Sequence, residues 1–218
     1  HPLVHVNTST FVEQRFSTRF SGAEFYLADH VVGSQKTLPG VAYLEMARSA
    51  GEMAAGRPVR AIRNLTWESP LIVGGDAKTA EITLTPGRKE VDFAVRTGKV
   101  THCRGQLEYA GPKEESERLD IVGIRDRCKA EVVTRRELYP FLSAGGLNLG
   151  RSFQIVESIS GNENEALAVL VLPEHLKSEA DQFWLHPSLM DGALHTAIGL
   201  LRTNGMDAEL GLPYAVRE

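Results

Sequence analysis

A histidine and an aspartate far apart in the chain stand out as residues that could exchange protons with a substrate. His30 follows a strand-like run, in a glycine-containing loop just before a predicted helix, and loops held by rigid elements often carry reactive groups. Because imidazole titrates near neutral pH, His30 is suited to act as a general base. Asp191 lies one turn into another predicted helix, beside an apolar stripe. Low hydration there favours a protonated carboxyl, which is suited to act as a general acid.

Each of these side chains also has an ordinary structural explanation. His30 fits a plain loop residue, and Asp191 fits a charge that the helix dipole favours. His195 follows Asp191 by four residues on the same helix face; it is predicted either to orient Asp191 by a hydrogen bond or to be a partly exposed histidine. His186, before a proline, is expected to shape the start of the helix. These four residues include metal-ligand types, but their spacing gives no support for a metal site, and none is predicted.

The composition is that of an ordinary globular protein. The chain has 218 residues, of which 42% are apolar and 24% charged, with a formal net charge of -4. This charge argues against binding to nucleic acid or to anionic membranes, and no apolar run is long enough for a membrane span. Cys103 and Cys128 form no CxxC pair, so we expect buried thiols in a reducing cytoplasm. The first residue is not Met and no signal peptide is present, which predicts a piece of a longer polypeptide.

The first half of the chain predicts one helix and a series of strands. Residues 16–26 have strand character, and a helix begins after Pro39-Gly40 and ends at residues 56–58. Turn residues then separate four strand-like runs, at residues 61–73, 80–85, 91–96 and 100–109. Tyr43 and Trp184 are predicted in the core or in a tunnel wall. The pattern favours an α+β arrangement in which a sheet wraps one helix.

The second half repeats this outline after a charge-rich segment. We predict an N-terminal lobe at residues 1–110, a linker at 111–127 and a C-terminal lobe at 128–218; a merely solvated loop would explain residues 111–127 equally well. Thr134 and Glu137 form a predicted capping box, and strand-like runs follow at residues 153–159 and 166–172. The helix that begins at His186-Pro187 has its predicted buried stripe at Met190, Ala193, Leu194, Ala197, Ile198 and Leu201.

Several of these segments resemble the signatures of one family. The segment DHVVGSQKTLPG at residues 29–40 resembles the HxxxGxxxxP region of polyketide synthase dehydratase domains, and HPSLMDGALH at residues 186–195 resembles their HPxxxDxxxQ/H region. GLNLGRSFQ at residues 146–154 resembles their GxxYGxxF segment, and LPY at residues 212–214 resembles an LPF-type segment that follows. The order of the segments is that of the family over nearly the whole chain. The chain looks closest to the domains of bacterial trans-acyltransferase modular synthases.

This resemblance implies a double hotdog, in which two fused lobes each curl an antiparallel sheet around a central helix. His30 and Asp191 match the family's catalytic histidine and aspartate. The implied reaction removes water from a 3-hydroxyacyl thioester to give the 2-enoyl thioester, without a cofactor. The substrate would be carried on the phosphopantetheine of an acyl carrier protein. Further implied partners are the neighbouring synthase domains and a second copy in a homodimer. The implied localisation is cytoplasmic.

Supporting positions follow from the same segments. A backbone N–H at a helix start can stabilise the charge that develops on a thioester oxygen, and Gly40, just after Pro39, is the expected donor; a simple turn glycine is the alternative. In the GxxYGxxF segment Gly150 is retained, whereas Leu149 replaces the tyrosine that is thought to hold the substrate hydroxyl. Ser34 replaces the glycine of the first signature, with Gly33 one place early.

Two other functions stay open at this stage. The first is double-bond isomerisation or formation of an oxygen heterocycle by the same residues, although family members of this kind tend to lose the aspartate that is present here. The second is a non-catalytic scaffold, for which Leu149 and Ser34 would be the first signs of decay. The second lobe is also expected to continue past residue 218, and the acyl chain is not specified.

Overall fold

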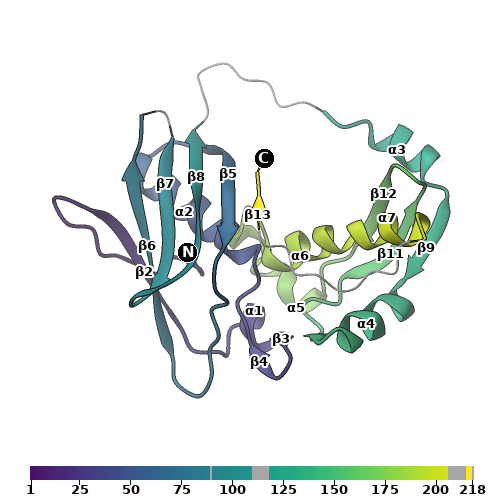
Figure 1. The fold of residues 1–218 in the computed structure, drawn as a ribbon, viewed down its shortest axis with the longest axis horizontal. Coiled ribbons are helices and arrows are strands. Elements are labelled where there is room, and N and C mark those ends of the chain that lie inside the picture. The colour runs from purple at the N-terminus through teal and green to yellow at the C-terminus, as the bar shows by residue number, and fades with distance from the viewer. Residues whose placement is uncertain (89, 110–117, 206–214, 218) are drawn as a thin grey trace.

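The chain folds into two lobes that lie side by side (Figure 1). The structure is a computed structural model, and it describes residues 1–88, 90–109, 118–205 and 215–217. Each lobe places a helix against antiparallel strands, as the α+β prediction requires.

The N-terminal lobe is built on a seven-stranded sheet in the order β1-β2-β6-β7-β8-β5-β13. Helix α2 packs against strands β5, β6 and β8 of this sheet. The elements of this lobe are β1 (Val6–Asn7), β2 (Gln14–Phe20), α1 (Phe25–Ala28), β3 (His30–Val32), β4 (Gln35–Lys36), α2 (Ala42–Ala55), β5 (Val59–Trp67), β6 (Lys78–Pro86), β7 (Val91–Thr97) and β8 (Val100–Tyr109).

Helix α2 is the central helix of this lobe. Tyr43, Met46, Ala47 and Ala50 are fully or almost fully buried along one face, which is the apolar stripe that drives an amphipathic helix onto a sheet. The helix ends at Gly56, whose φ of 63° is the left-handed conformation that glycine adopts without steric cost. The predicted start and end of this helix are therefore confirmed.

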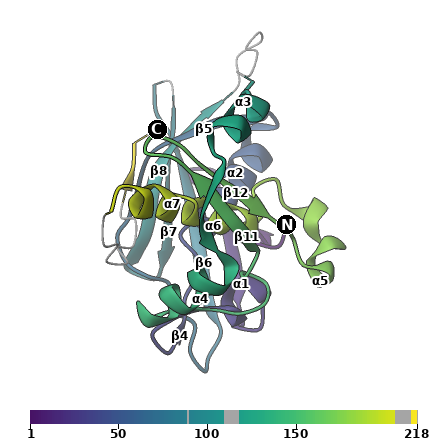
Figure 2. The same cartoon turned by 90° about the vertical axis from the view of Figure 1, so that its right-hand side faces the viewer.

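The C-terminal lobe contains a smaller sheet in the order β12-β11-β9, and α7 packs across all three of its strands. Figure 2 shows this lobe facing the viewer, with α4 and α5 at its periphery. Its elements are α3 (Ile121–Arg127), β9 (Ala130–Thr134), α4 (Arg135–Ala144), β10 (Leu147–Leu149), β11 (Val156–Gly161), β12 (Ala166–Leu170), α5 (Glu174–Lys177), the 3-10 turn Ala180–Gln182, α6 (Pro187–His195), α7 (Ala197–Thr203) and β13 (Ala215–Val216).

Two strand pairings connect the lobes. Strand β10 of the C-terminal lobe pairs with β3 in a small sheet of order β10-β3-β4, and β13 pairs with β5. Residues 215–216, which the sequence assigns to the second lobe, thus add a strand to the first lobe's sheet. Residues 121–127 of the predicted linker form α3, while residues 111–117 and the LPY segment lie outside the described residues.

Several sequence predictions need correction. The strand predicted at residues 16–26 ends at Phe20, because Glu24 accepts hydrogen bonds from the Ser21 and Gly22 amides and stabilises a turn there. The run predicted at residues 61–73 ends as a strand at Trp67. Trp184 is not in the core, since 72% of its surface is exposed. Tyr43, Cys103 and Cys128 are buried as predicted, and the Thr134–Glu137 capping box is present.

The helical stripe predicted after residue 186 is confirmed only in part: Ile198 is buried, but three other members are exposed. Leu194 is 44% exposed, and Ala193 and Ala197 are exposed as well. Two short helices occupy this stretch, and each approaches the C-terminal lobe's strands through a glycine, Gly192 in α6 and Gly199 in α7. A Cβ at Gly192 would lie 2.9 Å from Ile155, and one at Gly199 would lie 2.6 Å from Ile159. Asp191, next to Gly192, is buried as well.

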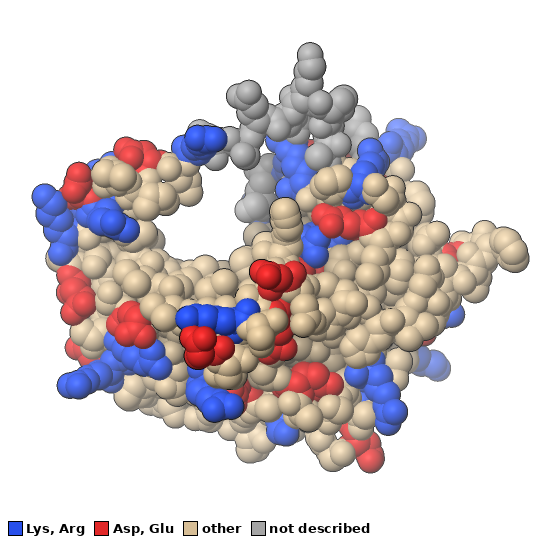
Figure 3. Space-filling model, turned by 180° about the vertical axis from the view of Figure 1, so that it is seen from behind, with Lys and Arg blue, Asp and Glu red and all other residues tan. Residues whose placement is uncertain are grey.

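Charged side chains are interspersed over the surface. On the face seen in Figure 3, the lysine and arginine side chains alternate with aspartate and glutamate. Such a mixture lacks the single-sign field that attracts nucleic acid or anionic lipid. Within the described residues, no helix is long and apolar enough to cross a membrane.

Candidate active site

His30 is the first residue of β3, between β4 and the C-terminal lobe's β10. The sequence predicted a loop here, but a three-residue strand forms, which pairs with β4 on one side and with β10, more than a hundred residues later, on the other. His30 is only 6% exposed. Its ring is held at one nitrogen, since Nδ1 lies 2.8 Å from the carbonyl oxygen of Thr37. The Thr37 amide also donates to the His30 carbonyl, so that one residue fixes both the backbone and the ring.

The bond to Thr37 determines which nitrogen of His30 can accept a proton. A carbonyl oxygen accepts hydrogen bonds only, so Nδ1 carries the proton in neutral imidazole and Nε2 keeps its lone pair. Burial lowers the pKa of His30 below its usual value of 6.5, because the charged form loses hydration. At neutral pH His30 is therefore a neutral imidazole with an oriented basic Nε2.

Asp191 lies on the buried face of α6. The helix begins at Pro187, with His186 as its N-cap residue: His186 Nδ1 accepts from the Ser188 amide at 3.2 Å. This confirms the structural role predicted for His186. Asp191 is 7% exposed, and burial raises its pKa from 3.8 to about 7. The carboxyl is therefore about half protonated at pH 7 and largely protonated below it, as a general acid must be.

Two further polar side chains share this helix face. His195, one turn after Asp191, is 8% exposed, and its Nε2 lies 3.6 Å from Asp191 Oδ2. Burial lowers the pKa of His195 to about 4, so between pH 4 and 7 both groups are neutral and the contact is not an ion pair. Ser188 is fully buried. Within the described residues, Ser188 Oγ, Asp191 Oδ2 and His195 Nδ1 have no hydrogen-bond partner.

Such unpaired buried polar atoms are costly unless a ligand or water satisfies them. Their gathering on one face of α6 indicates a site for a polar group of a bound molecule. Sequence reasoning missed Ser188, although its spacing of three residues before Asp191 places the two on one face.

The segment that follows β10 connects His30 with α6. Leu149 is the register partner of His30, and the ring of Phe153 lies 5.4 Å from the His30 ring. The Phe153 carbonyl accepts from the hydroxyl of Tyr139, whose pKa is raised to about 12 chiefly by burial, with a smaller contribution from the charge of Asp191. The charge of His30 likewise adds to the lowering of the His195 pKa. His30 and the polar face of α6 thus adjoin the same interior region between the lobes.

Asp29 fixes this connecting segment beside His30. Its Oδ2 accepts from the amide of Ser152 at 3.0 Å and from the Ser152 hydroxyl, and its carbonyl accepts from the Gly150 amide. A Cβ at Gly150 would overlap the Asp29 side chain, which explains why the position holds glycine. Leu149, 8% exposed, has no polar group to offer a substrate.

Pro39 and Gly40 lie at the start of α2 as predicted. The Gly40 carbonyl accepts from the indole nitrogen of Trp67 at 3.0 Å, and in the described part of the chain its amide donates to no acceptor. A Cβ there would lie 3.1 Å from the Trp67 ring, so glycine is also required for packing. Gly33, with a φ of 62°, occupies the tight turn between β3 and β4, which accounts for the shift of glycine from position 34 to 33.

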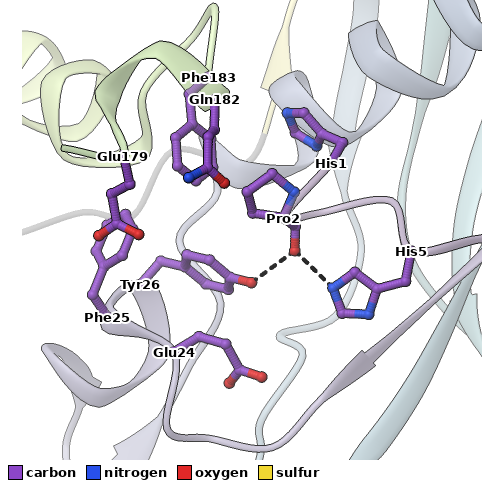
Figure 4. Close-up of a pocket in the computed structure, with 9 residues that line it drawn as sticks. All are labelled: His1, Pro2, His5, Glu24, Phe25, Tyr26, Glu179, Gln182 and Phe183. Atoms are coloured by element: carbon purple, nitrogen blue, oxygen red, sulfur yellow. Dashed lines mark hydrogen bonds between the residues drawn. The ribbon is translucent and has the colours of Figure 1, made fainter.

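A surface cavity of about 430 Å³ lies elsewhere, where residues 1–5 meet α1 and the 3-10 turn (Figure 4). Neither His30 nor Asp191 lines it. Phe25 connects it to the site, because its ring lines the cavity, stacks on His186 and contacts Phe153. In the described residues no group of three or more His, Cys, Asp or Glu side chains is placed to hold a metal ion.

Comparisons with known proteins assign the family. Residues 1–98 match the family model described as polyketide synthase dehydratase domain, and residues 117–218 match the model described as polyketide synthase dehydratase N-terminal domain. The crystal structure of a trans-AT PKS dehydratase domain from Brevibacillus brevis is 37% identical with a TM-score of 0.89, covering 100% of this chain and 79% of that one. The chain belongs to the polyketide synthase dehydratase family.

This membership confirms the double hotdog and the resemblance to trans-acyltransferase synthases. Among curated proteins, polyketide synthase PksM of Bacillus subtilis is 37% identical over 235 residues, covering 100% of this chain and 6% of PksM. The dehydratase-family chain thus spans a small part of this multidomain relative. A pyran synthase domain from module nine of the sorangicin pathway is 33% identical with a TM-score of 0.81, covering 100% of this chain and 79% of that one.

Proposed function

We propose that this domain removes water from a 3-hydroxyacyl thioester carried on the phosphopantetheine of an acyl carrier protein. One observation carries the proposal: burial moves the pKa values of His30 and Asp191 in opposite directions relative to their usual values. Near neutral pH this leaves an unprotonated imidazole beside a carboxyl of which about half is protonated. An elimination needs this combination of base and acid.

In the proposed reaction, Nε2 of His30 takes the proton from carbon 2 of the acyl chain. The electron pair of that C–H bond forms the double bond between carbons 2 and 3, through an enolate-like state. The bond between carbon 3 and its hydroxyl oxygen breaks, and the carboxyl of Asp191 gives its proton to the departing oxygen, which leaves as water. Each group contributes a rate factor on the order of 10² to 10⁴. Transfer of the proton from His30 back to Asp191 restores the starting state.

The remaining residues have supporting roles in this proposal. The free amide of Gly40, after Pro39, donates to the thioester oxygen as negative charge builds there. Ser188 and His195 contact the substrate hydroxyl or a water beside Asp191, where the structure leaves their polar atoms unpaired. Leu149 and Gly150 shape the wall next to His30. The elimination is redox-neutral, so the proposed step uses no cofactor.

The proposed partners follow from the family. Relatives such as PksM are much longer chains, and we expect an acyl carrier protein to deliver the substrate and neighbouring synthase domains to surround this one. A homodimer and a cytoplasmic location belong to the same proposal.

The experiment follows the mass of a 3-hydroxyacyl thioester, on a carrier protein or a pantetheine mimic, during incubation with the domain. Loss of one water that is abolished in His30→Ala and Asp191→Asn supports the proposal. Matched controls are His5→Ala and Asp76→Asn, because both residues are exposed, and these variants should keep full activity. Water loss that persists in either site variant would contradict the assignment of the pair.

The similarity to a pyran synthase domain favours one second candidate, ring closure by an oxygen nucleophile of the acyl chain. A substrate with a second, distal hydroxyl separates the two reactions. Dehydration alone gives an enoyl product with a conjugated double bond, whereas subsequent ring closure gives a product of the same mass without it. Double-bond isomerisation is tested with a 2-enoyl thioester as substrate: a product of the same mass whose double bond is no longer conjugated with the thioester would indicate it. No turnover with any acyl chain would leave the scaffold alternative.

A further inference from the structure

Glu45 on α2 is a fully buried carboxylate with hydrogen bonds from both lobes. It is 0% exposed. Its Oε1 accepts from the Trp184 amide at 2.9 Å, and its Oε2 accepts from the Leu185 amide at 2.9 Å. Arg48 donates to both oxygens, at 2.7 Å from Nε and 2.8 Å from Nη2. His1 Nε2 lies 3.0 Å from Oε1.

The amides that Glu45 binds lie just before the helix that carries Asp191. Trp184 and Leu185 precede His186, the N-cap residue of α6, and Asp191 follows within the helix's second turn. The bonds use backbone atoms, so they fix the path of the chain at the start of α6. The exposed Trp184 side chain contributes little to this contact.

Helix α2 is also connected with the other parts of the site. It begins two residues after Gly40, the proposed donor to the thioester oxygen, and Gly40 follows the β4 hairpin that holds His30 through Thr37. Helix α2 therefore fixes the position of the His30 side of the site relative to the start of α6. Glu45 is the group on that helix that contacts the chain leading to Asp191.

We propose that Glu45 is a positioning residue, which sets Asp191 against His30 and Gly40 by holding the Trp184 and Leu185 amides. This inference rests on the proposed dehydration. A carboxylate is required because each of its two oxygens accepts from a backbone N–H, whereas the amide group of glutamine would direct its own N–H groups at one of these donors. Displacements of about 1 Å at a catalytic group can lower a rate about 100-fold.

A role in stability alone is the competing explanation, and Glu52 provides the matched control. Glu52 lies two turns later on α2 and accepts from Arg48 Nη1 at 2.6 Å, as well as from the Val59 amide within the N-terminal lobe. Among the residues that the structure describes, Glu52 has no hydrogen bond to the chain that leads into α6. Glu52→Gln therefore perturbs the same arginine and the same helix without touching the contact between the lobes.

The experiment compares Glu45→Gln, Glu45→Asp and Glu52→Gln for kcat, KM and thermal unfolding. We expect Glu45→Gln to lower kcat by about tenfold or more with KM changed less than about threefold, because alignment rather than binding is lost. Glu52→Gln should keep kcat within about twofold. Glu45→Asp keeps the charge and shortens the reach, so it should fold and show an intermediate loss of kcat. Unchanged kcat in folded Glu45 variants, or an equal loss in Glu52→Gln, would overturn the proposal.

Hydrogen exchange of the Trp184 and Leu185 amides tests the contact without relying on turnover. Exchange at both amides should accelerate at least about tenfold in Glu45→Gln and stay unchanged in Glu52→Gln. If the wild-type domain is inactive but this exchange pattern is found, the proposed function fails while the contact through Glu45 stands. If exchange is unaffected in Glu45→Gln, the positioning role is refuted whatever the activity.

Discussion

Nε2 of His195 lies 3.6 Å from Oδ2 of Asp191, one turn apart on the buried face of α6. This separation is longer than a hydrogen bond. With a pKa of about 4, His195 is neutral when the carboxyl is protonated, so it orients the site by contact and as a potential hydrogen-bond partner, without supplying charge.

His195→Gln should therefore keep most of the activity, because the amide retains a donor and an acceptor near Asp191. We expect kcat within about threefold of wild type for this variant and a loss of about tenfold for His195→Leu, which removes both polar atoms. Steady-state kinetics with a carrier-bound or pantetheine thioester checks the difference. Equal activity of the glutamine and leucine variants would show that His195 only fills space.

The pH dependence of kcat/KM should be bell-shaped. His30 must be unprotonated to act as the base, and its pKa lies below 6.5, so the rate falls on the acidic side of that pKa. Asp191 must be protonated to act as the acid, so the rate falls again above its pKa of about 7. The optimum should therefore lie between these two values. A rate that keeps rising well above pH 8 would assign the acid role to another group.

The buried carboxyl of Asp191 should also cost stability at alkaline pH. Because its pKa is raised from 3.8 to about 7 on folding, the folded state binds this proton more tightly. The stabilisation that the folded state gains by binding this proton is fully present below pH 3.8, and it is lost as the pH rises through about 7. Asp191→Asn removes this loss, so the variant should be more stable than wild type at pH 8, with an upper bound on the order of 4 kcal/mol.

Thermal unfolding at a series of pH values checks this expectation. The gain of Asp191→Asn over wild type should be smallest near pH 4 and largest at pH 8, and the exposed control Asp76→Asn should show no such trend. A gain of the same size at both pH values would come from packing and not from the raised pKa. If Asp191→Asn is more stable but inactive, the carboxyl that catalysis requires lowers the stability of the folded domain.

The elements that local signals define could be predicted from the sequence. Gly56 ends α2, and Thr134 with Glu137 caps α4, because turn and cap residues act on their immediate neighbours. The family signatures gave the positions of His30 and Asp191. What the sequence missed depends on distant partners: β3 pairs locally with β4, but its first residue, His30, pairs with Leu149 of β10.

The face of α6 was mispredicted for a similar reason. Apolar periodicity predicts that Leu194 is buried, yet it is 44% exposed. The residues that approach Ile155 and Ile159 closely are instead Gly192 of α6 and Gly199 of α7. The two glycines, seven residues apart, indicate these close contacts. A hydrophobicity pattern alone does not reveal them. The roles of Glu45 and Ser188 likewise became visible only when their neighbours from other elements were known.

Asp29 accepts two hydrogen bonds from Ser152, and two variants separate their contributions to stability and activity. Ser152→Ala removes the hydroxyl but keeps the backbone amide bonded to Asp29 Oδ2, so it should cost about 1 kcal/mol and change kcat little. Asp29→Ala removes both bonds and leaves the buried Ser152 amide without an acceptor. Its cost in unfolding free energy should reach about 2 to 3 kcal/mol.

Because Ser152 precedes Phe153, whose ring contacts His30, Asp29→Ala should also lower kcat by about tenfold, while Ser152→Ala should not. Urea unfolding and steady-state kinetics on the two variants measure both effects. Asp29→Asn keeps an oxygen that can accept from Ser152 and should recover most of the activity. If Asp29→Ala lost stability but kept its kcat, the loop that carries Phe153 would have no part in aligning the base.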